Sequence, residues 1–276
     1  MSRTSTSGKF NIKDKVIVIT GGEGILGGTL ATAFASLGAV IIILGINEES
    51  GTRLKQDIAE AGGRVEFYKT NVLHRDELTR VSAEIVRQFG RIDALINAAG
   101  GNMAGATIGE HETFFDLDPD DFRKVTELNL DGTVIPSLVF AEQMSLQKEG
   151  VILNFSSMTS QRAVSRVAGY SAAKAAVDNF TKWLAVEMAT KFGEGIRVNA
   201  IAPGFLVTNQ NRELLLDKNN KLTPRGKSII DHTPFGRFGE PEELTGTVLW
   251  LISDASSFVT GSVIPVDGGF SAYSGV

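Results

Sequence analysis

The feature that most constrains this chain is a regular alternation of short apolar runs with helical patterns along its whole length. The apolar runs mostly lack an apolar–polar alternation, which is typical of strands covered on both faces. They lie at 16–20, 40–44, 65–68, 94–97, 151–155, 198–201 and 262–266, with helical patterns near 25–37, 48–61, 76–89, 119–146, 169–192 and 240–253. Each crossover is long enough for a β-α-β unit. The pattern therefore predicts an α/β fold with a doubly wound, Rossmann-type parallel sheet and helices on both faces.

Length and composition set the broad class of the protein. No linker, internal repeat or low-complexity tract divides the 276 residues, so we expect a single domain over residues 10–276. Residues 1–9 are polar, and we expect them to be disordered. The chain has no cysteine, which excludes thiol nucleophiles, cysteine-ligated zinc and iron–sulfur clusters and fits a reducing compartment.

Charge and hydropathy argue against several classes of partner. The net charge of -5 comes with no long basic stretch, which argues against nucleic-acid binding. The sequence shows neither a signal peptide nor an apolar run long enough to span a membrane, so we expect a soluble, cytoplasmic protein. His74, His111 and His232 lack the spacing of a site such as H-E-x-x-H, so we expect no metal. His232 is a candidate for the border of a substrate site.

Two loop-rich segments, 101–117 and 205–238, interrupt the alternation. Both follow predicted strands. Because ligands of doubly wound sheets bind at the carboxyl ends of the strands, we expect these segments to form the walls of a substrate site. Pro136 falls inside a predicted helix and should kink it, although Gly132, four residues earlier, reduces the clash with the proline ring.

The first strand runs directly into a glycine-rich segment, "VIVITGGEGILGG". Gly22, Gly24 and Gly27 satisfy the spacing G-x-G-x-x-G. A second spacing, T-G-x-x-x-G-x-G from Thr20, fails by one residue because Ile25 stands where its middle glycine should be. A strand before the loop and a helix after it are the context that phosphate binding requires, since glycines let the backbone approach a pyrophosphate and helix amides point at it. The alternative is a tight turn without a ligand.

Tyr170 and Lys174 lie four residues apart on one face of a predicted helix. A phenol has an ordinary pKa of about 10, and a nearby cation can lower it by roughly 1–3, so that the phenol can act as a general acid or base near neutral pH. Ser157 ends the strand "VILNFSS" and can bring a hydroxyl to the same point. Asn129 lies in the apolar face of a long helix, where a structural side chain bonded to backbone is the preferred interpretation of this residue alone.

These residues, together with "NAAG" (97–100), "APG" (202–204) and "VTGSVIPVDGG" near the C-terminus, resemble the short-chain dehydrogenase/reductase family along essentially the whole chain. The resemblance implies that Tyr170 donates or accepts the proton and that Ser157 donates a hydrogen bond to the substrate oxygen. It implies that Lys174 holds the nicotinamide ribose and lowers the pKa of Tyr170, and that Asn129 orders a water in the proton relay. The cofactor-binding residues that it implies are Thr20, Gly21, Gly22, Gly24, Ile25, Leu26, Gly27, Asn47, Asn71, Val72, Asn97, Ala98, Ala99, Gly100, Tyr170, Lys174, Pro203, Gly204 and Thr208.

The chain departs from the family pattern at three of these positions. Ala98 replaces the usual second asparagine, and Asn71 stands where an aspartate usually meets the adenine. Ile25 replaces a glycine of the loop. We expect Gly24 to supply the close approach to the cofactor one residue early, with Ile25 turned toward the cofactor or into the helix packing.

The end of the second strand gives no direct sign of cofactor choice. An acid at this place favours NAD by binding the ribose 2′-OH and an arginine favours NADP, but this chain has Gly45 and Ile46 there. The nearest charges belong to Glu23, Glu48 and Glu49, and acids repel a 2′-phosphate. We therefore expect NAD(H), with NADP(H) left open.

Several longer stretches resemble the D-mannonate oxidoreductase (fructuronate reductase) branch of the family. They include "NFSSMTS", "APGFLVTNQNRELL" and "HTPFGRFGEPEEL". This resemblance implies that the enzyme interconverts a keto sugar acid and its hydroxy acid, with D-fructuronate and D-mannonate as the favoured pair. The alternatives are another keto-uronate, such as an alginate-derived 4-deoxy-5-keto uronate, or a ketogluconate.

A sugar acid brings a carboxylate whose burial requires a partner, and the fork of an arginine suits it. Of the two candidates in the predicted walls we prefer Arg212 to Arg162. A helix-surface arginine paired with an acid is the competing interpretation of Arg212. Further candidates for substrate contact, each with a solvated loop residue as the competing interpretation, are Asn102, Gln161 and Gln210 beside the catalytic Ser157.

A nucleotide-binding redox sensor is the non-enzyme alternative. Such a protein could keep the glycine loop, but it would have no reason to keep Tyr170, Lys174, Ser157 and Asn129 at these spacings. The family resemblance also implies a homotetramer, built by pairing the helices predicted at 119–146 and 169–192.

Overall fold

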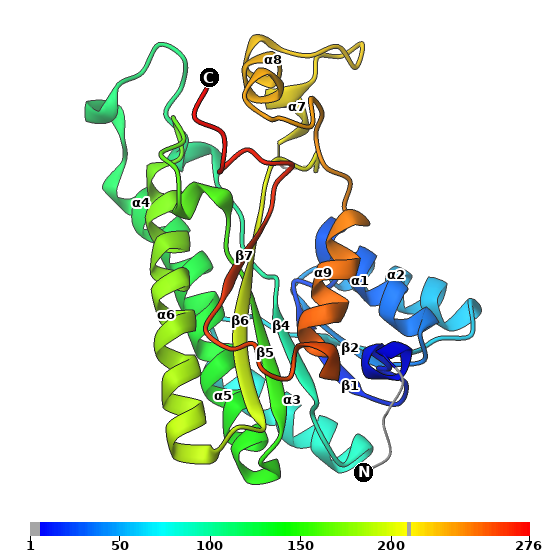
Figure 1. Ribbon diagram of the computed structural model, residues 1–276. Coiled ribbons are helices and arrows are strands. Elements are labelled where there is room, and N and C mark those ends of the chain that lie inside the picture. The colour runs from blue at the N-terminus through cyan, green and yellow to red at the C-terminus, as the bar shows by residue number, and fades with distance from the viewer. Residues whose placement is uncertain (1–5, 209–210) are drawn as a thin grey trace.

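The structure is a computed structural model that describes residues 6–208 and 211–276. Within these residues the strands form one seven-stranded sheet in the order β3-β2-β1-β4-β5-β6-β7, and all neighbouring strands are parallel (Figure 1). The strands are β1 Val16–Thr20, β2 Val40–Gly45, β3 Arg64–Lys69, β4 Ala94–Asn97, β5 Gly150–Phe155, β6 Ile196–Pro203 and β7 Val263–Val266. The predicted doubly wound parallel sheet is confirmed.

Helices cover both faces of this sheet (Figure 1). The described helices are α1 Ile25–Ser36, α2 Glu48–Glu60, α3 Arg75–Phe89, α4 Pro119–Thr126, α5 Gly132–Gln147, α6 Ala168–Phe192, α7 Arg212–Leu215, α8 Pro224–Asp231 and α9 Glu243–Ile252. In β1, Ile17 and Ile19 belong to the core formed with α1, α2 and α9, whereas Val16 and Val18 belong to the core formed with α3, α5 and α6. Because both sides of each central strand are buried, the strands read as unbroken apolar runs.

The strand order places a topological switch point at β1. The chain runs outward from β1 to β2 and β3, then returns to place β4 on the other side of β1. In sheets of this kind the ligand crevice opens beyond the carboxyl ends of the strands at that point. The glycine loop after β1 and the "AAGG" segment after β4 both begin there, so the fold brings them together.

The long helix predicted at 119–146 is interrupted in the structure. α4 is followed by a π-helical turn at Glu127–Asp131, and α5 begins only at Gly132. Pro136 lies inside α5, where it has no N–H to donate to the carbonyl of Gly132. The irregular turn lies before α5, and a π-turn of this kind is often found at functional sites.

Part of the segment 1–9, for which the sequence predicts disorder, is described by the structure from residue 6 onward. A short 3-10 helix spans Thr6–Phe10 and lies beside another 3-10 helix at Asp254–Ser256. The side chain of Ile12, directly after it, is buried in the core, and this burial fixes the chain that leads into β1.

The two loop-rich segments lie beyond the carboxyl ends of the strands, as predicted (Figure 1). Segment 101–117 contains two short 3-10 helices, Ala104–Ala106 and Phe114–Asp116, and segment 205–238 contains α7 and α8. None of the helices within the described residues combines the length and apolar character that crossing a bilayer requires.

Candidate active site

The structure decides between the two glycine spacings in the first loop. Gly21 has a φ of +61°, and a Cβ there would lie 2.8 Å from the Cα of Ala99 in the neighbouring strand loop. A Cβ at Gly27 would lie 2.7 Å from the Cα of Gly22. Both positions meet backbone, which cannot give way. The loop therefore requires Gly27, which both spacings share, and Gly21, which only the T-G-x-x-x-G-x-G spacing contains.

Ile25, which stands in place of the middle glycine of that spacing, is the first residue of α1. Gly24 is the N-cap of α1, has extended backbone and offers no side-chain cap to the first amides of the helix. Ile25 is 37% exposed, so of the two orientations expected for it the one in the helix packing is not adopted, and the neighbouring Leu26 packs on the core instead. Uncapped amides at a helix start form an anion site, which fits the pyrophosphate of a dinucleotide.

Several residues predicted to bind the cofactor have their side chains in structural contacts. The Oγ1 of Thr20 accepts the N–H of Ala99 at 3.1 Å and ties β1 to the loop after β4. The Nδ2 of Asn97 donates to Ser137 and to Asn154 inside the core, at 3.0 and 2.9 Å. Both side chains are fully buried, so only their backbone or their positioning effect is available to a ligand.

The candidates after β2 and β3 are likewise engaged locally. Asn47 caps α2 by accepting the N–H of Ser50 at 3.0 Å, and Asn71 accepts the N–H of Leu73 at 3.0 Å. Val72 is buried. These contacts shape the turns at the ends of β2 and β3 and leave the prediction of cofactor contact there untested.

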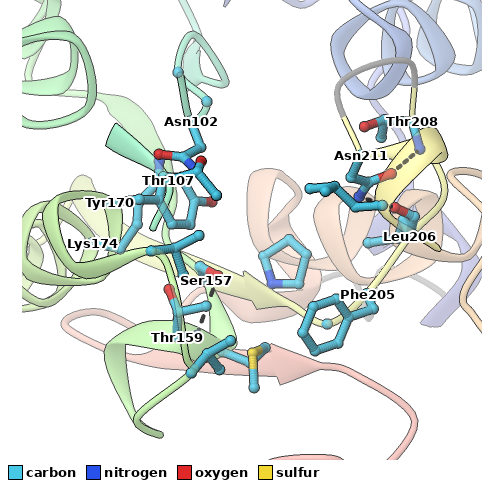
Figure 2. A pocket seen from close by; sticks show the side chains of 18 of the residues that line it. Asn102, Thr107, Ser157, Thr159, Tyr170, Lys174, Phe205, Leu206, Thr208 and Asn211 are labelled. Carbon is cyan, nitrogen blue, oxygen red and sulfur yellow. Dashed lines mark hydrogen bonds between the residues drawn. The ribbon is translucent and has the colours of Figure 1, made fainter. Parts of the chain in front are cut away.

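The remaining candidates surround a cavity of about 580 Å³ at the carboxyl ends of β4, β5 and β6. Figure 2 shows Asn102, Tyr170 and Ser157 on one wall and Thr208 and Asn211 on the opposite wall, with open space between them. Predicted site residues that line this cavity are Leu26, Ala98, Gly100, Asn102, Ser157, Tyr170, Lys174, Pro203, Gly204 and Thr208. Gln210 lies outside the described residues.

Tyr170 and Ser157 lie on the same wall of the cavity, and a hydrogen bond joins their side chains. Burial raises the pKa of the Tyr170 phenol above its ordinary value, and its hydrogen bond with Ser157 lowers the pKa in part. The Oγ of Ser157 also accepts the N–H of Thr159 at 3.2 Å, which fixes the orientation of the hydroxyl. Burial is the largest influence on this phenol, and the lowering of its pKa by Lys174 stays a prediction.

Lys174 is itself changed by burial. Its Nζ donates to the carbonyl of Phe155 at 2.7 Å and lies 5.5 Å from the centre of the Tyr170 ring. Burial lowers the pKa of Lys174 to about 8, against an opposing influence of Asp178. Asp178 is held in turn by the hydroxyls of Ser156 and Ser160. The ammonium therefore loses its proton within a range close to neutral pH.

Asn129 lies at the centre of the π-helical turn and is fully buried. Its Nδ2 donates to the carbonyls of Gly101 at 2.7 Å and Val125 at 2.8 Å, and its Oδ1 accepts the N–H of Gly101 at 3.1 Å. The side chain thus binds both polar groups of one backbone residue in the cavity wall. This supports the structural interpretation, and the water-ordering role stays a prediction.

The arginines predicted to bind a substrate carboxylate do not line the cavity. Arg162 is exposed and donates from Nε to the carbonyl of Ser271 at 2.7 Å. Arg212 is exposed and bonds Asn220. Gln161 and His232 are also exposed. Local turns of the chain direct these side chains to solvent, which the sequence pattern alone could not show.

Arg225 was missed by the sequence analysis and lines the cavity. It belongs to α8, and its guanidinium donates to the hydroxyl and the carbonyl of Ser165, both at 3.2 Å. Burial and the positive charge of Arg166 lower its pKa. Its place inside the predicted wall 205–238 was the available signal, but that wall contains several arginines.

Arg225 and Arg166 form a positive pair without an acid. Within the described residues, neither guanidinium takes part in an ion pair. Arg166 has a φ of +79°, which is rare for a non-glycine residue, and its Nε donates to the carbonyl of Ile108 at 2.7 Å. Such strain is found most often where surrounding structure holds a residue for function.

The cavity also offers hydrogen-bonding atoms that the protein does not use. The Oδ1 of Asn102 and the Oγ1 of Thr159 are buried and have no partner among the described residues. Both residues line the cavity, and Glu213 adds a carboxylate to the same lining. A ligand rich in hydroxyl groups would satisfy these atoms.

The sequence of this chain is similar to a known protein family and to a curated relative. The chain matches the family model described as Enoyl-(Acyl carrier protein) reductase over residues 23–271. An uncharacterized oxidoreductase of Haemophilus influenzae is 46% identical over 278 residues, which cover 96% of each chain.

Two solved structures resemble the chain over nearly its whole length. A proposed D-mannonate oxidoreductase from Haemophilus influenzae with bound NAD is 46% identical, with a TM-score of 0.90 and coverage of 96% of this chain and 98% of that one. A proposed NAD(P)-dependent gluconate 5-dehydrogenase from Beutenbergia cavernae, with NADP at low occupancy, is 31% identical. Its TM-score is 0.83, with coverage of 96% of this chain and all of that one.

Proposed function

The chain belongs to the short-chain dehydrogenase/reductase family, and from that premise we propose that it interconverts a keto sugar acid and its hydroxy acid, with D-fructuronate and D-mannonate as the favoured pair. It is an NAD(P)(H)-dependent oxidoreductase acting on CH–OH groups, which removes the non-enzymatic redox sensor from consideration. The identity of the substrate is our proposal, and the residues that line the cavity support it.

The observation that carries the substrate proposal is Arg225. A guanidinium in a cavity wall, beside a second arginine and with no acid partner in the part of the chain that the structure describes, provides a site for an anion. Arginine suits a carboxylate because its fork donates two parallel hydrogen bonds. The unpartnered oxygens of Asn102 and Thr159 support the sugar part of the proposal, since both can accept from hydroxyl groups.

The residues around the cavity fit a nicotinamide dinucleotide. The cradle of Gly21 and Gly27, the uncapped start of α1, and Lys174 beside Tyr170 provide the pyrophosphate site and the ribose contact that the family uses. When bound, the reduced nicotinamide supplies a hydride to the carbonyl carbon. We assign NAD(H) as the preferred form, supported by the NAD in the Haemophilus influenzae relative.

The chain's own residues supply the proton and hold the oxygen. In the reducing direction Tyr170 donates its phenolic proton to the carbonyl oxygen, while Ser157 donates a hydrogen bond to the same oxygen. Because burial raises the pKa of Tyr170, the phenol is protonated at neutral pH, which is the form that reduction needs. Lys174 would hold the nicotinamide ribose, and Asn129 holds the cavity wall at Gly101.

A second candidate substrate class is a ketogluconate. The similarity to a proposed gluconate 5-dehydrogenase favours it, and its carboxylate would also meet Arg225. D-Fructuronate and a 5-ketogluconate carry the ketone at the same distance from the carboxylate and differ in the configuration of a hydroxyl-bearing carbon. A substrate panel therefore separates them.

The test is a panel of keto-uronates, ketogluconates and aldonates assayed with both nicotinamide cofactors. D-fructose is the matched control for D-fructuronate, because the two differ only in having CH₂OH or carboxylate at one end of the carbon chain. We expect D-fructuronate to give the highest kcat/KM and D-fructose to be a poor substrate. An enzyme that prefers uncharged ketones to every keto acid in the panel contradicts the proposal.

We also propose a cytoplasmic homotetramer that uses α5 and α6 as interface helices. Its support is a set of apolar side chains left exposed on these helices: Leu138, Leu146, Trp183 and Val186. Exposed apolar side chains of this size gathered on neighbouring helices are typical of a protein interface. Light scattering after size exclusion measures the assembly, and Trp183→Glu should shift it to smaller species.

A further inference from the structure

Glu23, in the loop between β1 and α1, reaches across to the end of β2. Its Oε1 accepts the backbone N–H of Ile46 at 2.9 Å and that of Asn47 at 3.4 Å. Two backbone donors therefore hold the carboxylate in one place. The contact joins segments that are far apart along the chain but adjacent at the edge of the sheet.

Gly45, the last residue of β2, leaves the space that this carboxylate fills. A Cβ at Gly45 would overlap the carboxylate of Glu23. Gly45 does not have a positive φ, so the glycine serves this close approach and not an unusual backbone conformation. In dinucleotide-binding sheets the end of β2 is where an acid accepts a hydrogen bond from the ribose 2′-OH. A carboxylate stands at this place here as well, but the glycine loop supplies it.

The second oxygen of Glu23 has unused hydrogen-bonding capacity. Oε2 is buried and has no partner among the described residues, while the residue as a whole is only half-buried. A carboxylate oxygen away from water is costly without a donor. A ribose hydroxyl is a donor of the right kind.

The other charged residues near the end of β2 are engaged with one another. Glu48 pairs with Lys69 at 3.0 Å and Glu49 pairs with Arg53 at 2.6 Å, and all four side chains are exposed. Lys69 and Arg53 are therefore each paired with an acid. Glu23 is the acid held at the end of β2 without an ion-pair partner among the described residues.

We propose that Glu23 accepts a hydrogen bond from the adenosine ribose and makes the site select NAD(H) over NADP(H). Its negative charge repels a 2′-phosphate at the same place. Gly45 is required because it admits the carboxylate. This inference rests on nucleotide binding by the family and on the proposed preference for NAD(H), and it is independent of the sugar-acid substrate.

Equilibrium binding without keto acid tests the inference. Kd values for NADH and NADPH are measured by nucleotide fluorescence, and ADP-ribose with and without a 2′-phosphate isolates the adenosine side. We expect the wild type to bind NADH more tightly than NADPH. Because the variant loses a charge-assisted hydrogen bond and a repulsion, Glu23→Gln should reduce this preference by at least about tenfold. The matched control Glu48→Gln, at an exposed acid on α2, should change the preference by less than about twofold.

A swap experiment locates the effect. Glu23→Gly removes the loop carboxylate, and adding Gly45→Asp returns an acid at the end of β2. The double variant should recover the preference for NADH that the single Glu23→Gly variant loses, with thermal unfolding as a check that each variant is folded. A folded Glu23→Gln or Glu23→Gly variant that keeps the wild-type ratio of Kd values overturns the inference. A folded double variant no more selective than Glu23→Gly also overturns it.

Discussion

Asn129 and Gly101 bond each other through two reciprocal hydrogen bonds. Asn129 donates to the Gly101 carbonyl at 2.7 Å, and the Gly101 N–H donates to the Asn129 side chain at 3.1 Å. The pair joins the π-helical turn after α4 to the loop after β4. It therefore fixes the cavity wall next to the reacting groups without placing the Asn129 side chain in the open space.

The first prediction follows from this pair. Asn129→Ala leaves both polar groups of Gly101 without their partner, and each unsatisfied buried group costs about 1–3 kcal/mol. The free energy of unfolding from urea denaturation should fall accordingly, together with kcat. Asn129→Asp should destabilise at least as much as Asn129→Ala, because a buried carboxylate accepts from Gly101 but can donate to neither the Gly101 nor the Val125 carbonyl. The exposed Asn219→Asp is the control, and equal effects of the two Asp variants would contradict the structural role.

The second prediction concerns proton transfer. Tyr170→Phe keeps the ring but removes the phenol, so kcat should fall by about 10²–10⁴-fold, the usual contribution of a positioned general acid. Binding of NADH should change little, because the Phe ring keeps the packing beside Lys174. Steady-state kinetics across the pH range, with a binding titration alongside, provides the measurement. Retention of most of the activity at every pH would remove Tyr170 from this role.

The third prediction uses the lowered pKa of Lys174. The folded-state pKa of about 8 lies below the ordinary 10.5, so between these values the unfolded chain holds a proton that the folded chain has released. Stability therefore increases as pH rises through this window, and below pH 8 the fold carries the full cost of the buried charge. The unfolding free energy of the wild type minus that of Lys174→Met isolates the contribution of the Lys174 ammonium. The difference in unfolding free energy should move by about 2 kcal/mol in favour of wild type between pH 7 and pH 9.5, and a flat difference would show that the pKa is not lowered.

The fourth prediction distinguishes two arginines of the same wall. Arg225→Ala should raise KM for the keto-uronate at least about tenfold, since a charge-assisted, forked contact is lost. KM for NADH and for an uncharged ketone should stay unchanged. Arg212→Ala is the matched control, because Arg212 is exposed and bonds Asn220 outside the cavity. The opposite result, with Arg212 sensitive and Arg225 silent, would return the carboxylate site to Arg212.

The fifth prediction compares two adjacent glycines of α1. A Cβ at Gly27 would press on the backbone of Gly22, and overpacking of this kind costs about 1–3 kcal/mol. Gly27→Ala should therefore lower the melting temperature and weaken NADH binding. At Gly28 the nearest atom to a new Cβ is the flexible Cδ2 of Leu54, at 3.3 Å. Gly28→Ala should be neutral or slightly stabilising, and similar losses in both variants would argue against the backbone contact.

The sequence by itself determined the sheet and the order of its elements, and it predicted the reacting groups. Unbroken apolar runs such as Ile17–Ile19 arise from burial on both faces, and burial is written into residue type. Tyr170 and Lys174 meet because helical periodicity places residues four apart on one face. These features depend on local geometry, and a single chain segment contains all the information they need.

Only the tertiary structure decided what depends on contacts between distant segments. Glu23 stands at the end of β2 because the β1 and β2 loops meet at one edge of the sheet, and Arg225 reaches the cavity because α8 folds back over the strand ends. The π-turn, the raised pKa of Tyr170 and the exposed positions of Arg162 and Arg212 belong to the same group. The direction of a side chain in a loop and the burial of a charged group depend on the residues that pack against them. These residues come from distant parts of the chain, so a local sequence pattern does not predict them.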